Sequence, residues 1–61
     1  MDIDEKDAVN RCRLQALEIE CLTEALAGLT TDPRTATGLA GLQRLANRLS
    51  EDLNIILEEA E

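Results

Sequence analysis

The segment Arg11–Leu29, RCRLQALEIECLTEALAGL, decides the fold because it carries two apolar stripes when it is read as a helix. At about 100° per residue, one stripe is Ala8, Cys12, Ile19, Leu22 and Leu26, and the opposite stripe is Leu14, Leu17, Cys21 and Ala25. A helix in a simple hairpin has one neighbour and needs one apolar stripe. The segment therefore predicts neighbours on both sides of this helix, supplied by self-association or by a protein partner.

The first helix has a clear start and a clear stop in the sequence. Asp2 or Asp4 can cap its N-terminus, because an aspartate side chain accepts a hydrogen bond from a free backbone N–H. The segment then runs without glycine or proline to about residue 27, and Gly28 predicts a left-handed C-cap. We expect helix 1 over about 3–27.

A second helix follows a short turn. Asp32 with Pro33 is typical of a helix start, where proline's missing N–H costs nothing, and Thr37 is an alternative cap. The apolar residues that follow fall on one face: Leu39, Leu42, Leu45, Ala46, Leu49, Leu53, Ile56 and Leu57. We expect a turn at about 28–32 and helix 2 over about 33–59, in a single domain spanning residues 1–61.

Two helices of similar length joined by a short turn predict an all-α fold, an antiparallel helical hairpin. We expect the second helix to cover the Cys12–Ile19–Leu26 stripe, with Cys12 buried as a small apolar residue. Two hairpins would then dimerise into a four-helix bundle. That bundle either buries Leu14 and Leu17, or uses the first stripe and leaves the second as a docking surface.

Composition favours a homodimer. A monomer of 61 residues is marginally stable unless a disulfide, a metal or a partner stabilises it. Cys12 and Cys21 lie on one helix, too far apart to bond within the chain, and without histidine or a paired ligand the sequence offers no metal or other cofactor site. Oligomerisation is the remaining means of stabilisation.

Charge limits the partners. The net charge of −7 repels nucleic acid and anionic lipid, and no apolar run reaches membrane-spanning length. The acidic N-terminus, MDIDEKD, is unlike a secretory signal, and two unpaired thiols suit a reducing compartment. We expect a cytoplasmic protein with no membrane association.

Twelve positions match a known family of helical hairpins: Glu5, Lys6, Ala8, Asn10, Arg13, Leu22, Glu24, Leu26 and Leu29, and, with one extra turn residue, Leu42, Ala46 and Leu49. Through these positions the chain resembles the Rop family, plasmid-encoded RNA-binding proteins in which a helical hairpin dimerises into a four-helix bundle. The resemblance implies inner-layer positions at Ala8, Cys12, Gln15, Ile19, Leu22, Leu26, Leu39, Leu42, Ala46, Leu49 and Leu53. All of them except Gln15 are apolar.

The family's RNA-binding face is not retained. Its positions correspond here to Ile3, Asn10, Leu14, Glu18 and Ala25, where the family has lysines, an asparagine, an aromatic residue and a glutamine. The counter-charges and the stacking ring that hold RNA are thus missing. Asn10 and Arg13 are the residues that would carry any remaining RNA contact.

Two surfaces are candidate sites. The Leu14, Leu17, Cys21 and Ala25 stripe predicts a dimer or partner interface. The hairpin brings both chain ends together, which predicts an acidic pole of Asp2, Asp4, Glu5, Asp7, Glu58, Glu59 and Glu61 that solubilises the chain or docks a basic partner. No basic residue lies one turn from Cys21 to activate its thiol, and we identify no catalytic residue.

These features favour a small, acidic, non-enzymatic protein-interaction module, such as an adaptor, an inhibitor or a chaperone-like factor, acting as a helical homodimer. A Rop-like RNA-binding regulator is one alternative. An acidic, nucleic-acid-mimicking inhibitor of a basic protein is another.

Overall fold

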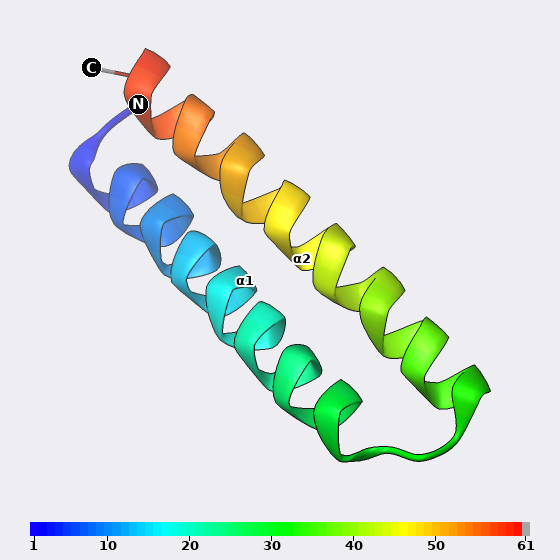
Figure 1. Cartoon of the computed structure of the whole chain (residues 1–61). Coiled ribbons are helices and arrows are strands. Elements are labelled where there is room, and N and C mark those ends of the chain that lie inside the picture. The colour runs from blue at the N-terminus through cyan, green and yellow to red at the C-terminus, as the bar shows by residue number, and fades with distance from the viewer. Residues whose placement is uncertain (61) are drawn as a thin grey trace.

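Two long antiparallel helices make up the fold (Figure 1). The computed structural model describes residues 1–60 and contains α1, Ile3–Leu29, and α2, Pro33–Glu59, each 27 residues long. The helices pack side by side into a rod of 45 × 14 × 11 Å. Both chain ends lie at one pole of the rod and the turn lies at the other (Figure 1). The expected all-helical hairpin is confirmed for these residues.

Aspartate side chains fix the start of each helix. The Asp2 carboxylate accepts a hydrogen bond from the backbone N–H of Glu5 at 2.8 Å. Asp32 accepts one from the backbone N–H of Arg34 at 3.2 Å, and Pro33 is the first residue of α2. Each cap satisfies a donor that has no partner within its helix. The predicted caps at Asp2 and Asp32 are confirmed, and the alternative start of α2 further along the chain is wrong.

The end of α1 differs from the expectation. The helix continues through Gly28 to Leu29, past the expected end near residue 27, and no glycine of the described residues has a positive φ. Thr30 ends the helix with an extended backbone, φ −82° and ψ 143°, and its N–H donates to the Leu26 carbonyl at 3.1 Å. The left-handed cap at Gly28 is wrong because an extended Thr30 already directs the chain into the connection to α2.

Small and polar side chains lie at the centre of the contact between the helices. Ala16 is 1% exposed and Ala46 is 7% exposed, and both are buried with Thr23 and Ser50. No other described residue is buried to this degree. Small side chains allow two helix backbones to approach closely, so this contact holds the hairpin together without any large apolar residue at its centre.

The contact repeats in alternating steps of three and four residues on both helices, as in a coiled coil. Its buried and half-buried positions, which we call the seam, are Val9, Arg13, Ala16, Glu20, Thr23 and Ala27 on α1, and Leu39, Gln43, Ala46, Ser50, Leu53 and Leu57 on α2. Because this spacing keeps one face of each helix toward the other, the helices stay in contact along most of their length.

The two buried hydroxyl groups of the seam bond within their own helices. Thr23 Oγ1 donates to the carbonyls of Ile19 and Glu20, at 2.8 and 2.9 Å, and Ser50 Oγ donates to the Asn47 carbonyl at 2.8 Å. A buried hydroxyl without a partner would cost roughly 1–3 kcal/mol. Thr23 and Ser50 are therefore tolerated in the seam although their hydroxyls make no hydrogen bond to the other helix.

The stripe that we expected α2 to cover is not covered. Cys12, Ile19 and Leu26 are all exposed, and Cys12 is not the buried apolar residue that we expected. The expectation is wrong because the seam passes along the neighbouring face of α1, through Ala16 and Thr23. Ile19 and Leu26 thus lie beside the contact instead of within it.

Overpacking the seam should destabilise the hairpin. We expect Ala16→Leu to lower the free energy of unfolding by about 1–3 kcal/mol, because leucine does not fit between the closely packed backbones. The matched control is Ala25→Leu, at an exposed alanine of the same helix, with an expected effect within about 0.5 kcal/mol. Urea unfolding followed by circular dichroism at one fixed protein concentration measures both. Equal stability of the two variants would contradict the position of the seam.

Candidate protein-interaction surfaces

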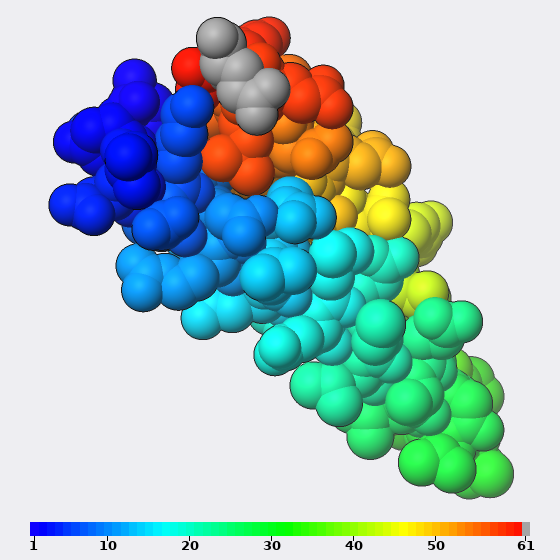
Figure 2. All heavy atoms as spheres, turned by 90° about the vertical axis from the view of Figure 1, so that its left-hand side faces the viewer, coloured from blue at the N-terminus to red at the C-terminus, as the bar shows by residue number. Residues whose placement is uncertain are grey.

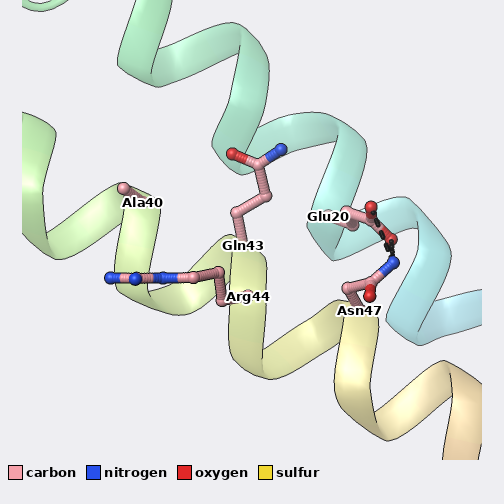
Figure 3. A pocket seen from close by; sticks show the side chains of 5 residues that line it. All are labelled: Glu20, Ala40, Gln43, Arg44 and Asn47. Carbon is pink, nitrogen blue, oxygen red and sulfur yellow. Dashed lines mark hydrogen bonds between the residues drawn. The ribbon is translucent and has the colours of Figure 1, made fainter.

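One flank of the seam is polar. Asn47 Nδ2 of α2 donates to the Glu20 carboxylate of α1, with distances of 3.1 and 3.3 Å to the two oxygens. Figure 3 shows this pair meeting between the helices, with the Arg44 guanidinium pointing away from it. Two shallow hollows on this flank are lined by Glu20, Ala40, Gln43, Arg44 and Asn47, and by Arg13, Leu17, Ser50, Glu51 and Asn54. We call this surface the polar flank.

The opposite flank of the seam is apolar. Counted at about 100° per residue from the seam, large aliphatic side chains of both helices fall on this side. They are Ile19, Leu22 and Leu26 of α1, with Cys12, and Leu42, Leu45, Leu49 and Ile56 of α2. The leucines and isoleucines are between 43% (Ile56) and 64% (Leu45) exposed. We call this two-helix surface the apolar face.

The apolar face has little polar interruption. Between Cys12 and Leu26 on α1, Gln15 is the polar residue at a matching helical position, and between Leu42 and Ile56 on α2 it is Asp52. A surface with so few charges loses little hydration energy when another surface covers it. The apolar face is thus chemically suited to burial, although the hairpin alone leaves it exposed.

The predicted interface stripe, Leu14, Leu17, Cys21 and Ala25, lies on the side of α1 away from the apolar face, and all four residues are exposed. We call it the outer stripe. Leu14, Leu17, Glu18, Cys21 and Leu22 line a shallow hollow that includes most of this stripe. Figure 2 views the molecule from the α1 side, where the blue-to-green helix forms the near surface.

The two cysteines lie on different surfaces. Cys12 belongs to the apolar face and Cys21 to the outer stripe, and both are exposed free thiols in the hairpin. Nine residues separate them along α1, which places them about 180° apart around the helix. Each cysteine is therefore a natural chemical probe of the surface to which it belongs.

The predicted acidic pole lies where the two chain ends meet (Figure 1). Its described residues are Asp2, Asp4, Glu5 and Asp7 near the start of α1, and Glu58 and Glu59 at the end of α2, all exposed. Glu61 lies outside the described residues. Glu58 accepts a hydrogen bond from Asn54 Nδ2 at 3.2 Å, and Asp2 caps α1, so these two carboxylates have structural partners.

The two residues predicted to carry any RNA contact bond to each other. Arg13 Nε and Nη2 donate to Asn10 Oδ1 at 3.2 and 2.9 Å, and both residues, Arg13 of the seam and Asn10 one turn before it, are half-buried. This pairing occupies the amide oxygen of Asn10 and one edge of the guanidinium. An RNA ligand would compete with this internal contact for the same groups.

Within residues 1–60, no three potential ligands among histidine, cysteine, aspartate and glutamate side chains come together in a metal-binding arrangement. No helix of that part of the chain combines the length and apolar character needed to cross a membrane.

Comparison with known proteins leaves the fold as the firm result. The chain matches no protein-family model, no curated protein sequence and no solved structure. The Rop-like identity thus has no support from these comparisons. What the structure shows of that resemblance is its architecture, two long helices packed as a hairpin.

Proposed function

We propose that the chain is a non-enzymatic protein-interaction module that acts as a homodimer, with the apolar faces of two hairpins packed together in a four-helix bundle. The observation that carries the proposal is that small residues are buried while large aliphatic residues are exposed. Ala16 and Ala46 are buried, whereas the leucines and isoleucines of the apolar face are about half exposed. A monomer in water rarely leaves a contiguous apolar surface of this kind uncovered.

Surface area supports a second copy as the cover. The hairpin has 4708 Å² of accessible surface, whereas a compact monomer of 6.7 kDa has about 3,900 Å². The rod shape of 45 × 14 × 11 Å accounts for part of this excess, and the whole excess of about 800 Å² is of the size that one partner buries in a standard protein–protein interface. A twofold pairing of hairpins would bring two identical, nearly uncharged faces together, and each would bury the other.

The positions implied by the Rop resemblance agree with this arrangement. Six of them, Cys12, Ile19, Leu22, Leu26, Leu42 and Leu49, belong to the apolar face, and three others, Leu39, Ala46 and Leu53, belong to the seam. These are the two surfaces that a four-helix bundle buries. We thus propose that the two hairpins of the bundle contact each other through their apolar faces. The outer stripe then stays available to another protein.

Absence of histidine from the sequence and the shallowness of the hollows favour binding over catalysis. The two exposed free thiols favour a cytoplasmic location, because a reducing compartment keeps such thiols unpaired.

Charges introduced into the apolar face should separate the dimer. We expect Leu26→Glu with Leu45→Glu to reduce the mass from twice 6.7 kDa to 6.7 kDa and to lose helicity, because few large side chains stabilise a lone hairpin. The matched control, Leu14→Glu with Leu17→Glu in the outer stripe, should remain a helical dimer. Light scattering with refractive-index detection suits a chain without aromatic residues, and circular dichroism measures helicity.

The thermal midpoint of the unmodified chain should also rise with protein concentration, as it does when association stabilises the fold. A fully helical monomer at high micromolar concentration would overturn the proposed dimer. Dissociation by the outer-stripe variant alone would assign the dimer contact to the wrong surface.

Thiol labelling should distinguish the two surfaces. We expect a maleimide dye to react more slowly with Cys12, in the Cys21→Ser variant, than with Cys21, in the Cys12→Ser variant, because only the apolar face is covered in the dimer. Dilution that dissociates the dimer should remove this difference, since both thiols are exposed in a single hairpin. Equal rates at high concentration, measured by mass spectrometry, would contradict burial of Cys12.

A further inference from the structure

The outer stripe remains free when the apolar faces pair, so it is the surface left for a second partner. Its residues follow steps of three, four and four along α1, from Leu14 to Ala25. At about 1.5 Å per residue the stripe is roughly 17 Å long, or about three helical turns. Three turns of apolar ridge and the shallow hollow beside Leu14, Leu17 and Cys21 suit the packing of one helix.

Charge distinguishes this surface from the apolar face. Glu18 and Glu24 lie on the two sides of the outer stripe, both exposed, and Glu18 also lines the hollow. Beyond the N-terminal end of the stripe, Asp7 and Arg11 are four residues apart and offset each other. Arg13 lines a hollow with Leu17, where Glu51 of α2 offsets its charge, so the net charge beside Leu17 and Cys21 is negative.

These carboxylates make a second copy of the chain a poor occupant of the outer stripe. A twofold contact centred on the outer stripe would bring the two copies of Glu18 close to each other. Like charges at an interface weaken association, whereas lysine and arginine at the same places would strengthen it. The apolar face has no such carboxylate pair along its centre, which is why self-association favours that face.

We propose that the outer stripe binds an amphipathic helix of another protein, one whose apolar ridge is flanked by lysine and arginine. This inference rests on the proposed function, because it takes the apolar face to be occupied by the second copy. Leucine-sized residues of the partner at i, i+3 or i+4, and i+7 pack against Leu14, Leu17 and Cys21. The partner's basic residues pair with Glu18 and Glu24, and the net charge of −7 accelerates the encounter.

A model peptide tests the proposal directly. The probe is a dye-labelled Leu/Lys peptide of about 18 residues with leucines at amphipathic-helix spacing, and the controls are its Leu/Glu counterpart and a scrambled Leu/Lys peptide. Fluorescence anisotropy measures binding to the full chain. We expect the amphipathic Leu/Lys peptide to bind and both controls to bind at least about tenfold more weakly. Equal binding of the scrambled peptide would overturn the proposal in favour of unspecific charge attraction.

Variants locate the contact. We expect Leu14→Ala with Leu17→Ala to weaken binding by about tenfold or more, whereas Leu29→Ala with Ile55→Ala, at exposed positions elsewhere, should have little effect. Glu18→Gln with Glu24→Gln should weaken binding several-fold. The matched charge control, Glu58→Gln with Glu59→Gln at the acidic pole, should not. A loss caused by the pole variant and not by the stripe variants would assign binding to the pole and overturn the proposal.

The salt dependence of peptide binding distinguishes a helix-docking stripe from an acidic, nucleic-acid-mimicking surface. Raising the ionic strength from about 0.1 M to about 1 M shortens the Debye length from about 10 Å to about 3 Å. Binding through leucines should weaken under these conditions but persist, whereas complete loss would identify a purely electrostatic, nucleic-acid-like surface and overturn the proposal.

Measuring the mass of the complex shows whether the peptide-binding inference fails or the proposed dimer itself fails. Two peptides bound to an intact dimer support the inference. If the dimer does not bind the peptide, or if the peptide dissociates the dimer by binding to the apolar face, this inference alone is overturned. A chain that is monomeric before any peptide is added overturns the proposed function as well.

Discussion

Close approach of two helix backbones at Ala16 and Ala46 is the constraint on which the rest of the structure depends. Side chains this small leave no room for leucine or isoleucine in the layers of the seam that contain them. The leucines and isoleucines of α1 therefore lie on either side of the contact, on the apolar face and on the outer stripe. Had Ile19 or Leu26 occupied the seam, α1 would have turned about its axis and exposed a different surface.

Such a seam provides little stabilisation by itself. Burial of apolar area contributes roughly 25 cal/mol per Å², and the side chains buried most fully here are among the smallest available. Ordering the backbone of each residue costs roughly 1–2 kcal/mol. Folding of the hairpin is thus expected to be coupled to covering of the apolar face, because the leucines and isoleucines of this face are about half exposed in the hairpin alone.

The sequence predicts the helices well and their packing poorly. Asp2, Asp32 and Pro33 are local signals, since a cap acts on backbone groups within a few residues, and they located both helix starts. The seam depends on Thr23 and Ser50, which read as polar in any pattern of hydrophobicity. Their hydroxyls bond to carbonyls of their own helices, so they cost little when buried. The outer stripe was identifiable from the sequence because leucines that repeat at helical spacing stand out, whereas small residues do not.

The position of both chain ends at one pole has a mechanical consequence (Figure 1). A force applied to the two ends acts across the helix pair, not along it, so it separates the helices one seam layer at a time. The first layers to open contain Leu57 and Val9, and the last lie near Ala27 and Leu39. Each step breaks only a few small contacts. A hairpin pulled from these two ends therefore opens layer by layer. The force required is far lower than the force needed to slide the two helices past each other.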